Sequence, residues 1–493
     1  MTNKSCAIIG AGLGGLSASI RLAIKGYHVT VFENNPTPGG KASQIIIDKF
    51  RFDTGPSLLT MPFVLQDLFS AAGENIQDYL QLQKLDIICK YFYSDGTIFN
   101  AYSNQNDFIN EAVRKTKEKK ENLEKFFSYS KKIYDLTAEL FLFSALLDSK
   151  NLFSTKSFKT LLQLKKIDSM RSMHEAIASF LIDDKMIQLF DRYATYNGSN
   201  PFAAPATLNL ISHVENGLGA FISSTGIFSI TESLYRLAVK LGVHFNFGKR
   251  VSKILVSNGR VNGIEVDSDR FNYDFLISNS DVNYTYQTLL NDKTSFYSNI
   301  YRKIEPSSSA VVFYWGVQGI HNQLEVHNIL FSENYKQEFD ELFKLRKIPS
   351  DPTIYIYISS KFNPLDAPTG YENWFVMINA PFDNDKTKLD ISQLKKKIIL
   401  KIKLLLNIDL MDKIITEEIL TPADIEIKTN SLKGSIYGIS SNTKFSAFMR
   451  QPNRSMKYRG LYFVGGSAHP GGGIPLVILS GKITSELISK YEK

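Results

Sequence analysis

Two short apolar runs with a helical pattern between them open the chain. Residues 6–9 and 28–32 are each as long as a strand buried in a sheet. Between them, apolar residues recur at helical spacing from Leu13 to Ile24, and Gly26 stands where a helix commonly ends. The pattern predicts a strand, a helix and a parallel second strand that ends on Glu33.

A glycine-rich loop joins the first predicted strand to the helix. Gly10, Gly12 and Gly15 occupy the pattern G-x-G-x-x-G, and Gly14 lies in the same loop. Glycine there permits a tight turn, close approach of the backbone to a pyrophosphate, and close packing of helix on strand. Glu33 follows about 20 residues later, where a carboxylate accepts hydrogen bonds from ribose hydroxyls. The combination predicts a dinucleotide site, and a tight turn in another α/β protein is the alternative.

Turn residues separate the apolar runs in the middle of the chain. Residues 50–57 predict a strand end and a turn, because Asp, Gly and Pro together interrupt regular structure. Residues 91–99 predict a hairpin with Asp95-Gly96 at its turn, and residues 107–190 follow a mostly helical pattern. Further strands are predicted at 243–247, 251–256, 261–266, 275–281, 309–317 and 353–359, and further helices at 208–214, 229–241 and 393–406.

The chain closes with a second glycine loop between a strand and a helix. Residues 461–464 form an apolar run, glycines dominate residues 465–473, and a helix begins near Pro475. A glycine loop that opens a helix allows a ligand to approach the backbone closely, as the first loop does. We expect the two loops to hold the two ends of one dinucleotide.

Composition allows large cores and excludes several classes of protein. The chain has 493 residues, which suits two or three interleaved domains, and 43% of them are hydrophobic and 12% aromatic. Cys6 and Cys89 are the two cysteines, so the sequence predicts neither a disulfide framework nor a metal cluster, and a reducing compartment is expected.

The net charge of +8 would suit an acidic partner, either nucleic acid or an anionic membrane surface. No nucleic-acid recognition motif accompanies it, so we expect no nucleic-acid partner. The sequence contains no run of about 18 apolar residues, which is the length that a membrane-spanning helix needs. Residues 136–164 mix Leu and Phe with lysines, which is typical of an interfacial helix or the rim of a lipid channel, although a helix packed on the protein is the alternative. We expect a cytoplasmic protein, peripheral on the inner face of a membrane, without a signal peptide.

Several segments together resemble the carotenoid (phytoene) desaturase family of the flavin amine oxidase superfamily. They are the first glycine motif with Glu33, the Gly39-Gly40-Lys41 that follows, residues 52–57, residues 277–279 with Asp281, and residues 463–475. The last segment is the most specific, since the family signature is close to G-x-x-T-H-P-G-x-G-I-P. Ser467-Ala468 and Thr225-Gly226 depart from the family pattern.

The resemblance implies an α/β fold with a Rossmann-like FAD-binding domain, an interleaved β-sheet substrate domain and a helical region that contacts a membrane. The implied division is 1–80 for the FAD-binding βαβ part, 81–105 for a substrate-domain hairpin, 106–215 for the helical region, 216–290 for the return to the FAD-binding domain, 291–420 for the substrate domain, and 421–493 for the C-terminal FAD-binding part.

The resemblance also implies non-covalent FAD and a long apolar carotenoid of thirty or forty carbons as substrate. The implied reaction removes a hydride from an allylic carbon, with the flavin as acceptor, and a proton from the neighbouring carbon. No strong base is obvious in the sequence. His469 is a candidate for steering the proton or the flavin ring, and a loop-packing role is the alternative. The residues implied to contact FAD are Gly10, Gly12, Gly14, Gly15, Glu33, Gly40, Lys41, Gly55, Pro56, Val251, Gly466, Gly473, Ile474 and Val477.

Within the family, residues 50–61 and 192–201 look most like desaturases that form the 3,4 bond of 1-hydroxycarotenoids. Phytoene desaturases and terminal-methyl oxygenases of thirty-carbon carotenoids are close alternatives, and the electron acceptor, oxygen or a quinone, stays open. Two alternatives lie outside the family: an amine oxidase and a non-enzymatic prenyl- or lipid-binding protein. Because no cysteine follows Cys89, such an amine oxidase could not bind its flavin covalently through a C-terminal cysteine. An NAD-dependent dehydrogenase would leave the second glycine loop unexplained.

Overall fold

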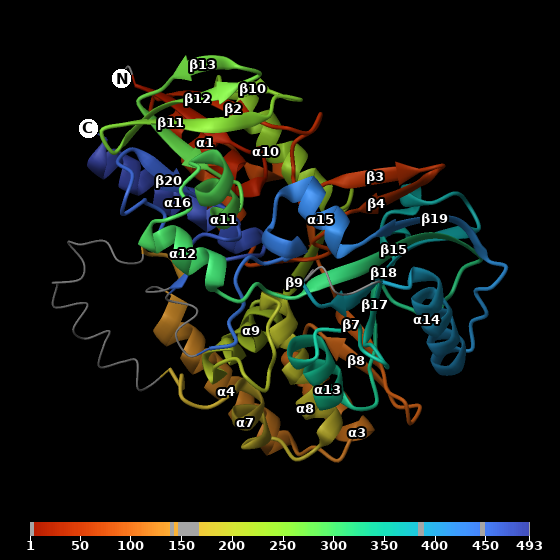
Figure 1. Cartoon of the computed structure of the whole chain (residues 1–493). Helices are drawn as coiled ribbons and strands as arrows, with labels where there is room; N and C mark the ends of the chain where they lie inside the picture. The colour runs from red at the N-terminus through yellow and green to blue at the C-terminus, as the bar shows by residue number, and fades with distance from the viewer. Residues whose placement is uncertain (1–3, 139–141, 146–166, 383–388, 444–448, 493) are drawn as a thin grey trace.

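Two large β-sheets, three smaller sheets and a layer of helices make up the described part of the protein (Figure 1). The computed structural model describes residues 4–138, 142–145, 167–382, 389–443 and 449–492. The beginning and the end of the chain lie close together at the top of the view, and the helices of the middle of the chain lie at the bottom.

The first sheet is parallel and takes strands from widely separated parts of the chain. Each of its strand pairs is parallel, and this confirms the strands predicted at the start, middle and end of the sequence. Its order is β10 (His244–Asn246), β2 (His28–Phe32), β1 (Ser5–Ile9), β14 (Phe275–Ser278) and β20 (Leu461–Phe463). Parallel strands end at the same edge, so the loops that follow β1, β2, β14 and β20 meet there.

Both faces of the parallel sheet are covered, which explains its uninterrupted apolar runs. Cys6 and Ile8 belong to the core that is shared with the helices, and Ala7 and Ile9 to the core on the opposite face. The helical face carries α1 (Leu13–Ile24), α10 (Phe228–Lys240) and α16 (Ile474–Tyr491). The other face carries an antiparallel sheet of β11 (Val251–Ser257), β12 (Arg260–Val266) and β13 (Asp269–Asn272).

The second sheet has seven strands and includes the predicted hairpin. The hairpin strand β7 joins the sheet through parallel pairing with β16, in which Asn328 lies opposite Lys90. The order is β19 (Ile414–Leu420), β15 (Ser309–Gln318), β18 (Tyr371–Ala380), β17 (Ile354–Tyr357), β16 (His327–Leu330), β7 (Ile87–Phe92) and β8 (Ile98–Tyr102).

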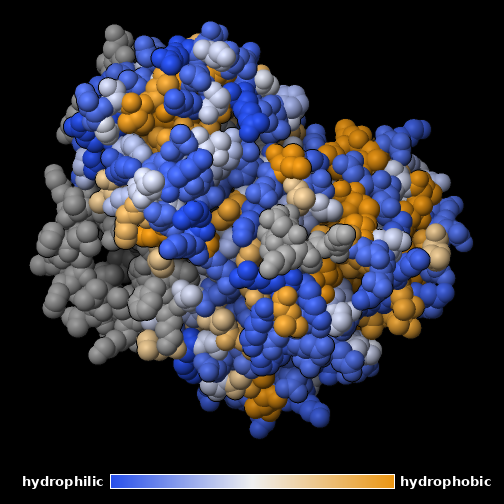
Figure 2. Space-filling view, in the orientation of Figure 1, coloured by the Kyte–Doolittle hydropathy of each residue, from blue (hydrophilic) through white to orange (hydrophobic). Residues whose placement is uncertain are grey.

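Alternate residues of the second sheet serve two different environments. Trp315 and Trp374 pack in the core under α14 (Ile391–Leu406), whose outer residue Leu404 is exposed. Tyr314 and Phe375 face the other way, toward the helical layer. In Figure 2, hydrophobic residues gather over the region of this sheet, while most of the visible face is hydrophilic.

The helical layer covers the second face of this sheet. It contains α3 (Gln105–Lys115), α4 (Lys120–Thr137), α7 (Met173–Ala178), α8 (Asp184–Asp191) and the 3-10 turn η4 (Arg192–Asn197). The apolar helix predicted at 208–214 is not a single regular helix. It is a 3-10 turn (Ala206–Asn209), one α-turn (α9, Leu210–Ser212) and a π-turn (His213–Gly217). Glu215 of the π-turn accepts a hydrogen bond from the Tyr193 hydroxyl at 3.0 Å, which ties this irregular segment to η4.

Asp53 fixes the position of the Asp-Thr-Gly-Pro turn. Its carboxylate ends β4 and accepts from the backbone N–H groups of Ile227 and Phe228, at 3.1 and 2.9 Å, where α10 begins. It therefore holds the turn against the helical face of the first sheet. The smaller elements are β3 (Gln44–Ile47), β4 (Phe50–Asp53), β5 (Leu59–Thr60), β6 (Leu82–Lys84), β9 (Ala220–Ser223), α2 (Phe63–Ala71), α11 (Val282–Tyr284), α12 (Phe296–Lys303), α13 (Tyr335–Phe339) and α15 (Pro422–Thr429).

Most of the stretch predicted to touch a membrane, residues 136–164, lies outside the described residues. Of the part that is described, Leu142 and Phe143 pack against the core of the first sheet. Across the ranges that the structure describes, no helix combines the length and apolar character needed to cross a membrane. Membrane contact and the domain boundaries given above stay predictions.

Substitution of Gly15 tests the close packing of α1 on β1. A Cβ atom on Gly15 would lie 2.2 Å from the Gly10 carbonyl oxygen, which belongs to the backbone and cannot move aside freely. We expect Gly15→Ala to lower the free energy of unfolding by about 3 kcal/mol or more, measured by urea denaturation.

Gly73→Ala is the matched control for this substitution. Gly73 has a φ of +74° with open space around its Cβ position, so alanine there introduces backbone strain of about 1 kcal/mol without a clash. Equal losses of stability in the two variants would contradict the packing argument.

Candidate functional site

One cavity of about 1060 Å³ reaches from the edge of the parallel sheet to the second sheet. Its walls include the loops that follow β1, β2, β14 and β20, the face of the second sheet that carries Tyr314 and Phe375, and residues of the helical layer. In open α/β sheets, ligands bind outside the carboxyl ends of the strands. The first end of the cavity therefore lies where such a fold holds a nucleotide.

The two glycine loops touch at this edge. A Cβ atom on Gly14 would lie 2.8 Å from the Gly465 backbone nitrogen and 2.7 Å from Asn279 Oδ1. Asn279 follows β14, and its Nδ2 donates to the Gly10 carbonyl at 3.2 Å. The two loops consequently form one continuous backbone surface, as the sequence predicts for the two ends of one ligand.

Two helices begin at this surface with N-termini that no side chain of the described residues caps. Gly12 is the N-cap of α1 and Gly473 that of α16. The first N–H groups of each helix therefore stay available to an anionic ligand, which the helix dipole also favours.

Glu33 closes the nucleotide end of the cavity. Its Oε2 accepts from the Ala11 N–H at 2.8 Å, and its Oε1 accepts from the backbone N–H and the side-chain amide of Asn35 at 2.9 and 2.8 Å. An ionised carboxylate can accept about four hydrogen bonds. Glu33 therefore keeps acceptor capacity for a ribose hydroxyl while its position is fixed by the first glycine loop.

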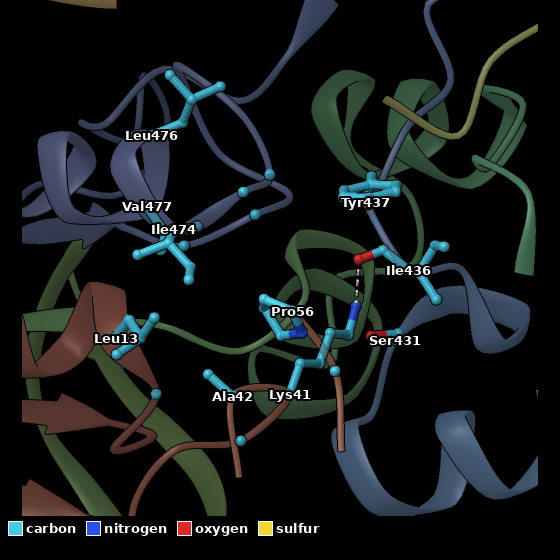
Figure 3. A pocket seen from close by; sticks show the side chains of 18 of the residues that line it. Leu13, Lys41, Ala42, Pro56, Ser431, Ile436, Tyr437, Ile474, Leu476 and Val477 are labelled. Carbon is cyan, nitrogen blue, oxygen red and sulfur yellow. Dashed lines mark hydrogen bonds between the residues drawn. The ribbon is translucent and has the colours of Figure 1, made fainter. Parts of the chain in front are cut away.

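Lys41 lines the cavity, and its side chain ends at backbone carbonyls rather than in solvent (Figure 3). Its side chain extends past Pro56, and its Nζ donates to the carbonyls of Ser435 and Ile436 at 2.9 and 3.0 Å. Burial lowers the pKa of Lys41 to about 8, and the negative charge of Asp281 opposes this shift. Lys41 thus links the N-terminal glycine pair to the segment before the C-terminal glycine loop.

Arg450 holds the second glycine loop through backbone carbonyls. Its guanidinium donates to the carbonyls of Gly466 at 3.0 Å, Ile439 at 3.1 Å and Tyr437 at 3.3 Å. Burial lowers the pKa of Arg450 to about 10. The sequence analysis missed this residue, because an isolated arginine between turns carries no pattern that marks it as buried.

His469 is buried inside the second glycine loop. Its Nε2 donates to the Ser144 carbonyl at 2.8 Å, and its backbone N–H donates to the Gln451 carbonyl at 2.9 Å. Burial lowers the pKa of the His469 imidazole to about 4. This geometry supports the loop-packing role, because the imidazole is neutral and its Nε2 is already engaged.

The second end of the cavity is mostly apolar. Val312, Phe375 and Met377 line it from the second sheet, and Ile211 and Val214 from the helical layer. Polar side chains stand among them, including Ser57, Tyr355, His327, Arg192 and Glu215. The sequence analysis singled out none of these five as a site residue, although Ser57 and Arg192 belong to the segments 50–61 and 192–201 that it compared with desaturases.

The cavity joins a dinucleotide cradle to an apolar compartment. Comparison with known proteins shows which family has this chain as a member. The model of the flavin-containing amine oxidoreductases matches residues 13–489. The chain belongs to this family. It is therefore an oxidoreductase with a flavin cofactor, as the resemblance implied, and the glycine cradle with its two helix N-termini fits such a group.

Curated relatives place it in the carotenoid desaturase branch of this family. The chain is 43% identical to a 1-hydroxycarotenoid 3,4-desaturase of a Flavobacterium species, over 98% of this chain and 99% of that protein. It is 34% identical to a 4,4'-diapolycopene oxygenase of a Methylomonas species, over 99% and 98% of the two chains. These full-length matches confirm the family resemblance seen in the motifs.

Solved structures show the same fold at much lower identity. Putrescine oxidase bound to putrescine superposes with a TM-score of 0.65 at 12% identity, over 99% of each chain. An oxidoreductase from Methanosarcina mazei gives a TM-score of 0.63 at 17% identity, over 98% of this chain and 100% of that one. The α/β flavoprotein fold expected from the sequence is thereby confirmed.

The flavoprotein's predicted cofactor residues gather around the one cavity. All of them line it except Gly15, which lies behind the first loop, against Gly10. Leu13 and Tyr437 line the same end in Figure 3 and were not predicted. Asn279 was also absent from the predicted cofactor residues, although it belongs to the segment 277–279 that carried part of the resemblance. Individual contacts to the flavin stay predictions.

Arg450 gives a test of the second glycine loop. Arg450→Met removes three charge-assisted hydrogen bonds that hold this loop, so we expect the flavin Kd to rise about 10- to 100-fold, measured by fluorescence titration of flavin-free protein. Arg459→Met is the control, because exposed Arg459 also donates to a carbonyl, that of Asn258, away from the cavity. An equal effect of the two substitutions would contradict the assignment.

The lowered pKa of Lys41 predicts a pH-dependent stability. Between pH 8 and pH 10.5 the unfolded chain keeps a proton on Lys41 that the folded protein has lost, so folded stability rises with pH in this window. In flavin-free protein, wild type should gain on the order of 1 kcal/mol over Lys41→Met across the window, since the side chain keeps some solvent contact. Parallel unfolding free energies at all pH values would show that Lys41 is not buried as described.

Proposed function

We propose that this flavoprotein is an FAD-dependent carotenoid desaturase that forms the 3,4 bond of a 1-hydroxycarotenoid. The observation that carries the proposal is the 43% identity to a 1-hydroxycarotenoid 3,4-desaturase over nearly all of both chains. The cavity adds independent support, because it joins a dinucleotide cradle to a compartment lined by aliphatic and aromatic side chains. A long polyene needs such a compartment to leave water.

The cradle favours FAD over a smaller flavin. Two separate helix N-termini meet at one cavity, which suits a pyrophosphate with a nucleoside on one side and the flavin ring on the other. In this assignment Glu33 accepts from the ribose of the adenosine, and the loops at Gly12, Gly14 and Gly466 hold the pyrophosphate. Gly55 and Pro56 lie toward the apolar compartment, where the flavin ring would meet the substrate.

In this proposal the chain's own residues bind and orient the polyene and keep water away from it. When bound, the flavin supplies a hydride acceptor. Val312, Phe375 and Met377 form the wall on which the polyene lies, and burial there excludes water from the carbon that loses the hydride. His469 does not receive the proton in this assignment, because its imidazole donates to the Ser144 carbonyl and has a pKa of about 4.

The same cavity supports delivery of the substrate from a membrane surface. Thr137, Leu142 and Ile167 line the cavity, and they flank the parts of the apolar stretch 136–164 that lie outside the described residues. Described residues within and just after a stretch suited to an interfacial helix therefore belong to the wall of the cavity. Peripheral attachment to the inner face of a membrane is the proposal that this supports, and oxygen and a quinone both remain candidates for the electron acceptor.

Pigment analysis tests the proposed reaction. The protein is produced in cells that make a 1-hydroxycarotenoid, phytoene or a thirty-carbon carotene, with Gly14→Val as a control that fills the contact between the glycine loops. We expect a red-shifted product two hydrogens lighter from the 1-hydroxy substrate alone, and none with Gly14→Val. Desaturation of phytoene, or a gain of oxygen on the thirty-carbon carotene as in the oxygenase relatives, would contradict the proposal.

A further inference from the structure

A chain of hydrogen bonds enters the apolar compartment from the predicted flavin side. Ser57, next to Pro56, contacts the Tyr355 hydroxyl at 2.6 Å, and this hydroxyl contacts His327 Nδ1 at 2.7 Å. The His327 ring lies nearly parallel to the ring of Tyr357, with centroids 5.0 Å apart. His327 is 1% exposed and lines the cavity, yet its Nε2 has no hydrogen-bond partner in the described part of the chain.

An ion pair lines the same cavity, and the charge of its arginine acts on His327. Arg192 Nη2 lies 3.4 Å from Glu215 Oε1, and both side chains are buried. Glu215 also accepts from the hydroxyls of Tyr193 and Tyr196. The Arg192 guanidinium lies over the rings of Tyr193 at 4.7 Å and Tyr196 at 5.2 Å, while its Nε has no hydrogen-bond partner among the described residues.

The polar cluster of Arg192, Glu215 and His327 has no net charge. Burial, followed by the positive charge of Arg192, lowers the pKa of the His327 imidazole to about 3, so the ring is neutral. The Arg192 charge is balanced by Glu215. An ammonium or a carboxylate would bring an unbalanced charge into this compartment, at a high desolvation cost. A neutral group that hydrogen-bonds fits the cluster, and a hydroxyl is the simplest one.

Unpartnered polar atoms in a buried wall also indicate a ligand. Nearly all buried polar groups of native proteins have a hydrogen-bond partner, and leaving one without a partner destabilises the protein. Two such atoms, His327 Nε2 and Arg192 Nε, occur in this one cluster. A ligand hydroxyl at His327 would satisfy the first of them.

The position of the cluster matches the proposed chemistry. In a 1-hydroxycarotenoid, one methylene carbon separates the hydroxylated carbon from the 3,4 bond, so the hydroxyl must bind close to the flavin ring. The hydrogen-bond chain that ends at His327 starts at Ser57, beside Gly55 and Pro56. A hydroxyl bound there would place the neighbouring carbons next to the predicted flavin contacts.

We propose that His327, oriented by Tyr355 and supported by the Arg192–Glu215 pair, binds the hydroxyl of the substrate and so selects the hydroxylated end of the polyene. His327 is a specificity residue in this proposal. The identity of the ligand rests on the proposed function, whereas the existence of a hydroxyl subsite rests on the cluster itself.

Two measurements on flavin-loaded protein test the subsite. The ligands are two acyclic polyenes of the same skeleton, one with and one without the tertiary hydroxyl group, supplied in detergent micelles. Polyene Kd is measured by absorbance titration, and flavin bleaching is followed without oxygen. We expect wild type to bind the hydroxylated polyene about 10- to 100-fold more tightly. His327→Phe, which keeps an aromatic ring against Tyr357, should bring this ratio close to one by weakening the hydroxylated ligand alone.

His327→Gln is the conservative variant and should keep most of the preference, because its amide can reach the same hydroxyl. Equal weakening of both polyenes by His327→Phe, or an unchanged preference, would overturn the subsite, and so would wild-type protein without a preference. A preference that is lost in His327→Phe, while neither polyene bleaches the flavin of wild type, would support the subsite and reject the proposed desaturase reaction.

Discussion

The contact between the two glycine loops is the constraint on which the rest of this structure depends. Gly14 and Gly465 come from opposite ends of the sequence, and a side chain on either would collide with Asn279 or with the other loop. Asn279 is tied to Gly10 through its amide, so three strand ends of the parallel sheet meet at one point. Because backbone alone can approach so closely, the uncapped N-termini of α1 and α16 lie at the same edge of the sheet, where they favour an anionic ligand.

This meeting point also organises the second half of the molecule. The turn after β4 is anchored to the start of α10 by Asp53, which fixes Gly55, Pro56 and Ser57 between the cradle and the second sheet. From there the cavity continues along the face of that sheet opposite to α14. The alternation of its strands thus gives one face to a structural core and the other to a ligand compartment.

Much of this arrangement follows from local sequence. Turn chemistry and apolar periodicity predict the strand, glycine loop and helix at each end of the chain, the Asp95-Gly96 hairpin, the strands of the parallel sheet, and β15 and β17 of the second sheet, and the structure confirms them. They did not predict β16, β18 and β19 of the second sheet. Residues 208–214, which lie within the irregular turns at 206–217, were predicted as one helix because the apolar spacing is helical. The tertiary contact of Glu215 with η4, which no local pattern encodes, accompanies the departure from that helix.

The nucleotide end of the site was predictable, and the substrate end was not. Glycine spacing and Glu33 mark a phosphate cradle within about 20 residues of each other. Arg192, Glu215, His327 and Tyr355 come from separate turns and strands, and only the folded sheet brings them together. Arg450 is similar, since it belongs to no motif and only the folded chain brings its guanidinium to the carbonyls of Gly466 and Ile439.

The central claim is that the flavin and the polyene occupy one continuous cavity. The most direct measurement is the absorbance spectrum of the bound flavin while the flavin-loaded protein is titrated, without oxygen, with a fully conjugated polyene that it cannot desaturate further. The account predicts a saturable shift of the flavin bands with the same midpoint as polyene binding, because the polyene lies against the ring. Saturable binding of the polyene with an unchanged flavin spectrum would contradict it.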